Sequence, residues 1–176
     1  ISRTPEETAL EVLDFVQTRL QNLLLSEGHD FETVAAVLAA GWRDVVDVAD
    51  KVKALEEVRR SPEFPALAVA FKRVINISRG AEPGKVDELL FEYPEENLLA
   101  EAALVMEANV EDALAQRDYP AVCRALAGLK GPVDAFFDKV LVMAEDVRVR
   151  RNRLALLRRI SETFLKMADF SRITTS

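Results

Sequence analysis

The chain has 176 residues, 49% of them hydrophobic, and a formal net charge of −7. This size and composition are typical of one soluble globular domain. The sequence has no eighteen-residue apolar run and no basic segment followed by an apolar core, so we expect neither a membrane span nor a signal peptide. The single cysteine, Cys123, excludes an internal disulfide and is typical of a cytoplasmic protein. One cysteine and one histidine cannot build a zinc site of the usual ligand types.

The first half of the chain is predicted to be helical. Apolar residues recur at spacings of three and four, which is the period of an α-helix. The first helix should follow the N-cap Thr4 and end at Gly28, with an apolar face made by Leu10, Leu13, Val16, Leu20 and Leu23. Further helices are expected at residues 31–38, 45–58 and 65–79.

The second half follows a loop at residues 81–84, where proline and glycine interrupt the pattern. Helices are expected at residues 98–115, 119–129, 131–144 and 146–168. Because no linker divides the chain, we predict one all-α bundle of about seven helices. Its core is expected to include Leu20, Phe71, Val74, Phe136, Phe137, Val140, Leu154, Leu157 and Phe164.

Charge is distributed unevenly along the chain. Residues 86–112 contain nine acids and no base, whereas residues 148–166 contain seven bases and one acid. At 100° per residue, one arc of the last helix carries Arg148, Arg151, Arg158, Arg159 and Lys166. A second arc, on the helix at residues 65–79, carries Lys72, Arg73, Asn76 and Arg79. The net negative charge argues against a nucleic-acid partner, and on charge alone both arcs are best read as solvated faces that pair with the acidic segment. A basic arc can still attract an anion locally.

Residues that could carry catalysis are few. The sequence has no glycine-rich phosphate loop and no paired-histidine motif. His29 is expected to be a solvated loop residue, and Cys123 a core residue. Asp134 and Asp138, one turn apart, are expected to pair with nearby arginines. A free-standing enzyme is therefore not expected.

Several sequence blocks resemble one family when taken in order. The C-terminal part reads GPVDAFFDKVLVMAED at residues 131–146, RRNRLALL at 150–157 and MADFS at 167–171. These blocks closely resemble the end of bacterial glycyl-tRNA synthetase beta subunits, which read PVDxFFDxVMVM…ED, RxNRLxLL and VADFS. Upstream, the similar blocks are DFVQTRL at residues 14–20, AFKRVINI at 70–77 and LFEYPE at 90–95. Departures are small: Leu141 replaces a commoner Met, Tyr93 replaces an acid, and the loop at residues 81–85 is short.

The resemblance implies a domain organisation and a fold. Residues 13–173 would be a helical anticodon-binding domain similar to that of arginyl-tRNA synthetase, with residues 1–12 as a lead-in and 174–176 as a tail. Because the sequence begins at Ile1, we expect a fragment of a longer protein.

The resemblance also implies the partners. The beta subunit pairs with a separate alpha subunit in an alpha2beta2 tetramer, and the alpha subunit activates glycine with ATP and Mg²⁺. This fragment would bind the anticodon region of glycine tRNA in the cytoplasm, without a cofactor of its own.

The expected site divides between the two arcs. Lys72, Arg73, Asn76 and Arg79 are assigned to reading the anticodon, because the amide of Asn76 can both donate and accept a hydrogen bond. Arg19 is a weaker addition. The arc at residues 148–166 is assigned to phosphates, which position RNA without reading it. Arg153 lies off that arc, and an equal alternative is a structural pair with Asp138 or Asp146; Asn152 has the same structural alternative.

A different class of function stays open. The acidic segment at residues 86–112 repels phosphate but can dock a basic protein surface. The chain would then be a helical module that holds subunits together without touching RNA.

Overall fold

The computed structural model describes residues 4–174, and this part of the chain contains only helices and loops. The prediction of an all-α fold is confirmed, and each of the eight α-helices corresponds to one of the expected helical segments. They are α1 (Pro5–Ser26), α2 (Phe31–Ala39), α3 (Val45–Arg59), α4 (Phe64–Ser78), α5 (Pro94–Ala115), α6 (Tyr119–Ala127), α7 (Lys130–Lys139) and α8 (Val147–Phe164). Two 3-10 turns, η1 (Glu88–Leu90) and η2 (Phe170–Arg172), complete the fold.

Three helices begin or end at residues other than those predicted from the sequence. α5 begins at Pro94, four residues before the predicted start. The carboxylate of Glu96 accepts hydrogen bonds from the backbone N–H groups of Glu92 and Tyr93 and so organises this first turn. α7 ends at Lys139 and does not continue to Ala144, because Val140 adopts an extended conformation with φ −109° and ψ 121°. Likewise α8 ends at Phe164, short of the predicted residue 168.

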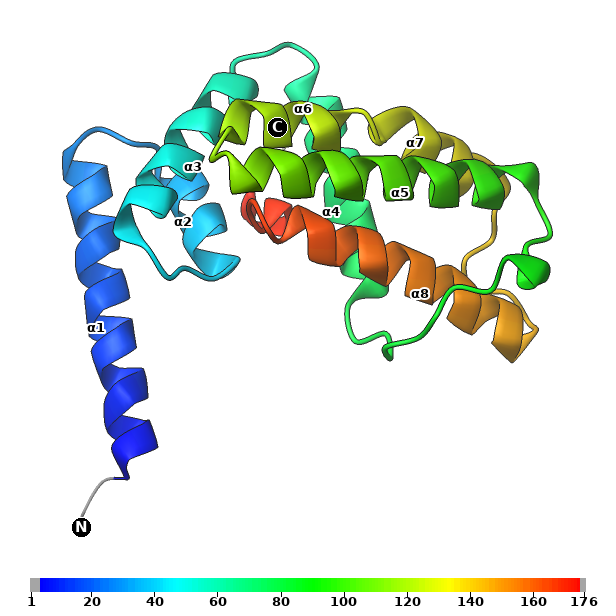
Figure 1. The fold of residues 1–176 in the computed structure, drawn as a ribbon, viewed down its shortest axis with the longest axis horizontal. Helices are drawn as coiled ribbons and strands as arrows, with labels where there is room; N and C mark the ends of the chain where they lie inside the picture. Colours follow the sequence, from blue (N-terminus) through cyan, green and yellow to red (C-terminus); the bar gives the residue numbers. More distant parts are fainter. Residues whose placement is uncertain (1–3, 175–176) are drawn as a thin grey trace.

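α4 lies at the centre of the bundle. It passes behind α5 in the view of Figure 1 and packs against α8, α7, α3 and η2. The ring of Phe71 stacks on Phe164 with centroids 4.0 Å apart and meets the edge of Phe170 at 5.0 Å. This aromatic cluster fills one side of α4, whereas Val69, Arg73 and Asn76 on another side of the helix are exposed.

The predicted core is largely confirmed. Seven of its nine residues are buried, and the remaining two, Phe137 and Leu154, are half-buried against it. Phe136 and Phe137 are neighbours on a helix and point about 100° apart. Phe136 is therefore fully enclosed, while Phe137 lies at the edge of the core beside α4.

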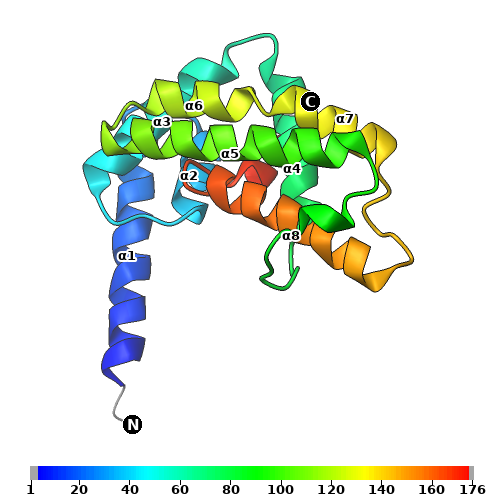
Figure 2. The same ribbon diagram turned by 45° about the vertical axis from the view of Figure 1, so that its right-hand side comes forward.

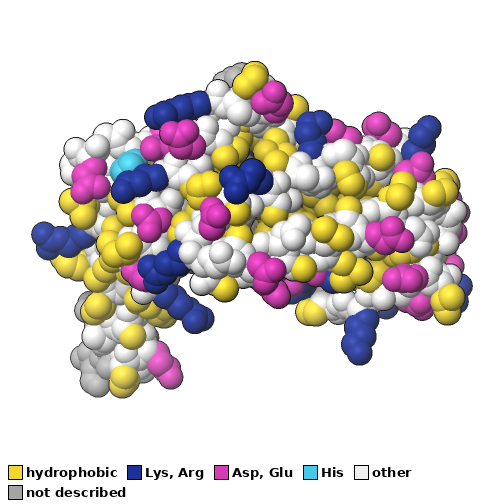
Figure 3. All heavy atoms as spheres, turned by 45° about the horizontal axis from the view of Figure 1, so that its top comes forward, with side chains coloured by type: hydrophobic (Ala, Val, Ile, Leu, Met, Phe, Trp, Pro, Cys, Tyr) yellow, Lys and Arg dark blue, Asp and Glu magenta, His cyan; other side chains and the backbone are white. Residues whose placement is uncertain are grey.

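α1 stands away from the rest of the molecule in both ribbon views (Figures 1 and 2). It packs mainly against α2, and only Leu20 and Leu24 are buried within it. The predicted apolar face is therefore mostly uncovered: Leu13 and Leu23 are more than half exposed, and hydrophobic side chains are visible on the projecting helix in Figure 3. α1 runs without a break through residue 12, so the lead-in and the domain share one helix.

Residues 4–174 lack two further features. None of the helices is both long and apolar enough to cross a membrane. The same residues contain no cluster of three or more metal-ligating side chains.

Candidate nucleic-acid interface

The outward side of α4 carries three of the four residues assigned to the anticodon. Lys72, Arg73 and Asn76 line a shallow hollow of about 620 Å³ together with Val69 and Ile77. Arg73 and Asn76 are exposed and Lys72 is half-buried. The helical periodicity brings them together because residues three and four apart share one face.

The cations of this α4 face are not neutralised by acids. α4 itself contains no acidic residue. Within residues 4–174, neither Lys72 nor Arg73 has a carboxylate within ion-pair distance, and the guanidinium of Arg73 lies over the Phe137 ring at 4.0 Å from its centroid. Arg79 follows the helix and donates a long hydrogen bond of 3.4 Å to the Ser171 hydroxyl. The α4 face therefore offers positive charge and an amide to solvent.

The C-terminal half of α8 differs, because α5 supplies acids across the bundle. Nε of Arg159 lies 2.6 Å from Oε1 of Glu107, and Nζ of Lys166 lies 3.5 Å from Oε1 of Glu111. Arg158 pairs with Glu162 at 2.9 Å and also donates to the carbonyl of Ala81. Pairing with the acidic segment, the first interpretation of this arc, is confirmed for Arg159 and Lys166.

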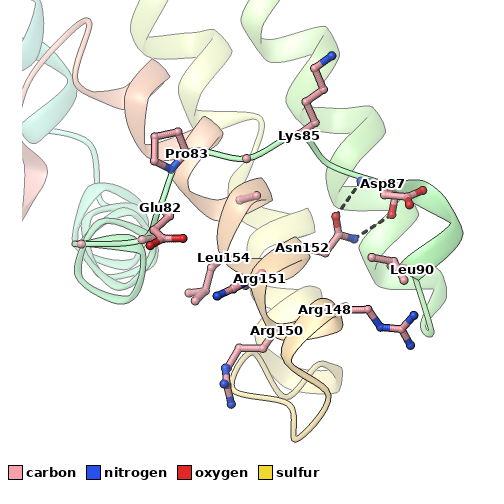
Figure 4. Close-up of a pocket in the computed structure, with 14 residues that line it drawn as sticks. Glu82, Pro83, Lys85, Asp87, Leu90, Arg148, Arg150, Arg151, Asn152 and Leu154 are labelled. Atoms are coloured by element: carbon pink, nitrogen blue, oxygen red, sulfur yellow. Dashed lines mark hydrogen bonds between the residues drawn. The ribbon is translucent and has the colours of Figure 1, made fainter.

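The N-terminal half of α8 is more open. Arg148, Arg150 and Arg151 leave the helix in different directions around a pocket of about 490 Å³, whose other wall is the loop at residues 80–85 (Figure 4). Arg148 pairs with Asp146 and holds the pKa of that carboxyl below its usual value. Arg151 is exposed and has no ion-pair partner within residues 4–174. Two of the five arc residues, Arg148 and Arg151, thus border one pocket.

Asn152 is structural, one of the two alternatives considered. Its amide oxygen accepts from the backbone N–H of Asp87 at 2.7 Å, and its amide nitrogen donates to the Asp87 carbonyl at 2.9 Å. Both bonds are drawn in Figure 4. They attach the loop after α4 to α8 and so shape the pocket.

Arg153 is also structural, but the predicted partners were wrong. It is 1% exposed, and it bonds Glu96 at 2.8 Å, Glu92 at 2.7 Å and the carbonyl of Leu141 at 2.9 Å. The hydrogen bonds to Glu96 raise the pKa of Arg153 above its usual value. Asp146 pairs with Arg148 instead, and the acidic partners of Arg153 are Glu92 and Glu96 and not Asp138. Glu96, which sequence reasoning missed, had one signal: an acid in the third position of a helix that opens with proline.

A family comparison decides what kind of domain this is. A model of the DALR anticodon binding domain matches residues 67–174. The chain belongs to the DALR anticodon-binding domain family. The matched region begins within α4 and includes the basic residues of both α4 and α8.

Three similar curated proteins are each named as a glycine–tRNA ligase beta subunit. The chain is 43% identical over 99% of its length to the glycine–tRNA ligase beta subunit of Syntrophus aciditrophicus (strain SB), and 45% identical over 99% to that of Geotalea uraniireducens (strain Rf4). It is 47% identical over 94% of its length to that of Anaeromyxobacter dehalogenans (strain 2CP-C). The chain spans about a quarter of the length of these relatives.

Arg19 lies apart from the site of this DALR domain. It is on α1, outside the matched residues, and its guanidinium lies 5.3 Å from the ring centroid of Phe15 on the same helix. It borders a separate hollow with Leu23 and Val45. The structure therefore does not bring Arg19 to the α4 face.

The other polar side chains considered for catalysis are structural. His29 is not solvated as predicted: its side chain is 14% exposed and Nδ1 lies 3.0 Å from Glu56. Asp134 pairs with Lys130 and not with an arginine. Burial raises the pKa of the Cys123 thiol to about 12, so the prediction of a core residue is confirmed.

The face drawn in Figure 3 has mixed charge. Basic and acidic side chains are interspersed over it, and hydrophobic side chains form a band along its middle. Phosphate binding needs a local excess of positive charge. The α4 face and the pocket at the N-terminal half of α8 are the better candidates.

Proposed function

We propose that this chain is the anticodon-binding module of the beta subunit of a glycine–tRNA ligase. The family match and the names of the similar proteins support this assignment. The module binds glycine tRNA in the cytoplasm and holds no cofactor of its own. ATP, Mg²⁺ and glycine belong to a separate alpha subunit, with which the full beta subunit forms an alpha2beta2 tetramer.

The α4 face is proposed to read the anticodon. The observation that carries this proposal is that Lys72, Arg73 and Asn76 share one hollow and face no carboxylate within residues 4–174. Glycine anticodons end in two cytosines, and each presents O2 and N3 as acceptors and N4 as a donor. The Asn76 amide can satisfy both kinds of group, which a lysine or arginine cannot. Unpaired loop bases expose these edges to a protein.

The N-terminal half of α8 is proposed to hold phosphates. Arg151 is free to contact RNA, and Arg148 is exposed despite its pair with Asp146. Arg158, Arg159 and Lys166 can contribute only by giving up the carboxylates that they already bind. Phosphate contacts on α8 would orient the loop so that its bases meet α4.

The test is binding of the chain to the anticodon stem-loop of a glycine tRNA and to one with a mismatched anticodon. We expect the wild-type chain to prefer the glycine loop, and Asn76→Ala to reduce that preference by about 1–3 kcal/mol. Asn109, an exposed asparagine on α5, provides the matched control variant Asn109→Ala. If Asn76→Ala keeps the preference while Arg158→Ala abolishes it, the reading face lies on α8.

A subunit-interaction module remains the second candidate, and one observation favours it. Leu104 and Val105 are at least half exposed on α5, close in sequence to the exposed acids Glu101 and Asp112. Such a surface suits a protein partner with basic flanks better than RNA. The same titration separates the two candidates, because this module would bind neither stem-loop.

A further inference from the structure

We propose that Arg73 and Phe137 form a platform on which one unpaired base of the anticodon loop stacks. The proposal rests on the function proposed above and adds a specific subsite to it. Phe137 comes from α7, so the subsite joins two helices that the sequence separates by 64 residues (137 minus 73).

In this pair the Arg73 guanidinium lies over the Phe137 ring, and Phe136 packs against that ring. The central guanidinium carbon of Arg73 lies 4.0 Å from the centroid of the Phe137 ring. The ring is half-buried, and its neighbour Phe136, which is fully buried, meets it in a T-shaped contact at 5.5 Å. A ring braced in this way restricts the guanidinium that lies on it. Arginine is suited to such stacking because its guanidinium is planar and weakly hydrated.

Arg73 is also not held by an acid. Arg59, Arg117 and Arg153 each donate to a carboxylate. Arg73 has no such partner within residues 4–174, and it is exposed. The guanidinium carbon lies over the Phe137 ring and the side chain is exposed, so the side of the guanidinium turned away from the ring is proposed to take the base.

The surroundings supply what a nucleotide needs besides a stacking surface. Asn76 lies one helical turn after Arg73 in the same hollow and can bond the edge of a base. Lys72 carries a charge suited to the adjacent phosphate, and the exposed Val69 offers apolar contact. Protein–RNA complexes use aromatic rings and arginine planes to stack bases that have left the helix. We infer that the stacked base is the one whose edge meets Asn76.

The experiment uses stem-loops with a fluorescent base analogue, 2-aminopurine or pyrrolocytosine, at each anticodon position in turn. Binding of the wild-type chain should change the fluorescence strongly at one position. Arg73→Lys keeps the charge but removes the plane, and Phe137→Leu removes the support. Each should abolish that change and weaken binding about tenfold.

The matched control is Arg124→Lys, at an exposed arginine of α6 that has no ion pair within residues 4–174. It should leave both readouts unchanged. Urea unfolding shows whether Phe137→Leu still folds, and Arg73→Lys tests the platform without altering the core. If Arg73→Lys keeps the wild-type fluorescence change and affinity, the platform is wrong. If the wild-type chain binds with no change at any position, the platform fails while the proposed function stands. Absence of all binding overturns both.

Discussion

The basic faces of α4 and α8 look alike in the sequence and differ in the structure. Each brings several cations to one side of a helix. On α4 the cations face solvent, because neither α4 nor its neighbours place a carboxylate beside Lys72 or Arg73 within residues 4–174. On α8 the cations beyond residue 157 meet carboxylates of α5 or of α8 itself. Whether a cation is available to a ligand is therefore decided by the helix packed against it.

Two arginines close together on α8 differ completely in solvent exposure. Arg151 is exposed and unpaired within residues 4–174, whereas Arg153 is 1% exposed and pairs with Glu96, which is fully buried. Adjacent positions on a helix differ by 100°, so two residues of separation suffice to turn a side chain from solvent to core. A count of basic residues along α8 overstates the charge that RNA can use.

The largest effect is expected from Arg153→Met. The variant leaves the carboxylate of Glu96 buried without its cation, which should lower the free energy of unfolding by about 3–5 kcal/mol. Urea unfolding measures this change. Arg151→Met, two residues earlier, is the control and should stay within about 0.5 kcal/mol of wild type. Equal effects of the two substitutions would remove the distinction between structural and available arginines on α8.

Asn152 on α8 and Asn76 on α4 allow the same comparison of the two helices with uncharged side chains. Asn152→Ala removes both hydrogen bonds to the Asp87 backbone and should lower the free energy of unfolding by about 1–3 kcal/mol. Asn76→Ala, at an exposed position, should leave unfolding nearly unchanged and reduce anticodon preference. Urea unfolding and stem-loop binding are measured on both variants. The opposite pattern would assign the reading role to Asn152.

Substitutions of Lys72 and Arg159 should have different effects on the salt dependence of RNA binding, and the difference is expected to be smaller than those above. Lys72→Gln should reduce the slope of log K against log salt by about 0.7, which is the loss of one single-strand phosphate contact. Arg159→Gln should leave the slope unchanged, because its charge is already paired with Glu107. Binding titrations at several salt concentrations give both slopes. A larger loss for Arg159→Gln would mean that the Glu107 pair opens when RNA binds.

The smallest effect is the stability change of Arg159→Gln itself. The Arg159–Glu107 pair is partly solvated, with 39% and 20% of the two side chains exposed. Such pairs contribute about 0–1 kcal/mol, so the variant should unfold at nearly the wild-type urea concentration. Unfolding at low and high salt checks this expectation. A loss approaching that of Arg153→Met would show that the two ion pairs are alike after all.

Sequence reasoning succeeded where the information lies within one helix. The periodicity around Phe71 identified both the buried side of α4 and the shared face of Lys72 and Asn76. It failed where the answer depends on a distant segment. The two acidic partners of Arg153 lie about sixty residues away, in and just before the first turn of α5. Likewise, the apolar pattern of α1 predicted a buried face, but burial requires a covering element, and of the predicted face only Leu20 is buried.

Phe137 likewise has one feature that the sequence predicts and one that depends on a distant helix. Its apolar character predicted a core position, and the structure places it half-buried at the edge. What the sequence could not show is the guanidinium that covers its ring, because α4 and α7 meet only in the folded chain. The residue assigned to packing is therefore also part of the proposed site.

The burial of Cys123 has a consequence for spectroscopy. It is the single cysteine of the chain, and with a pKa of about 12 it is almost entirely protonated at neutral pH as well as shielded from reagents. A cysteine introduced at the exposed Lys85 would therefore be the one thiol that reacts with a maleimide dye in the folded protein. The Lys85→Cys variant can thus be labelled beside the α8 pocket while Cys123 stays in place.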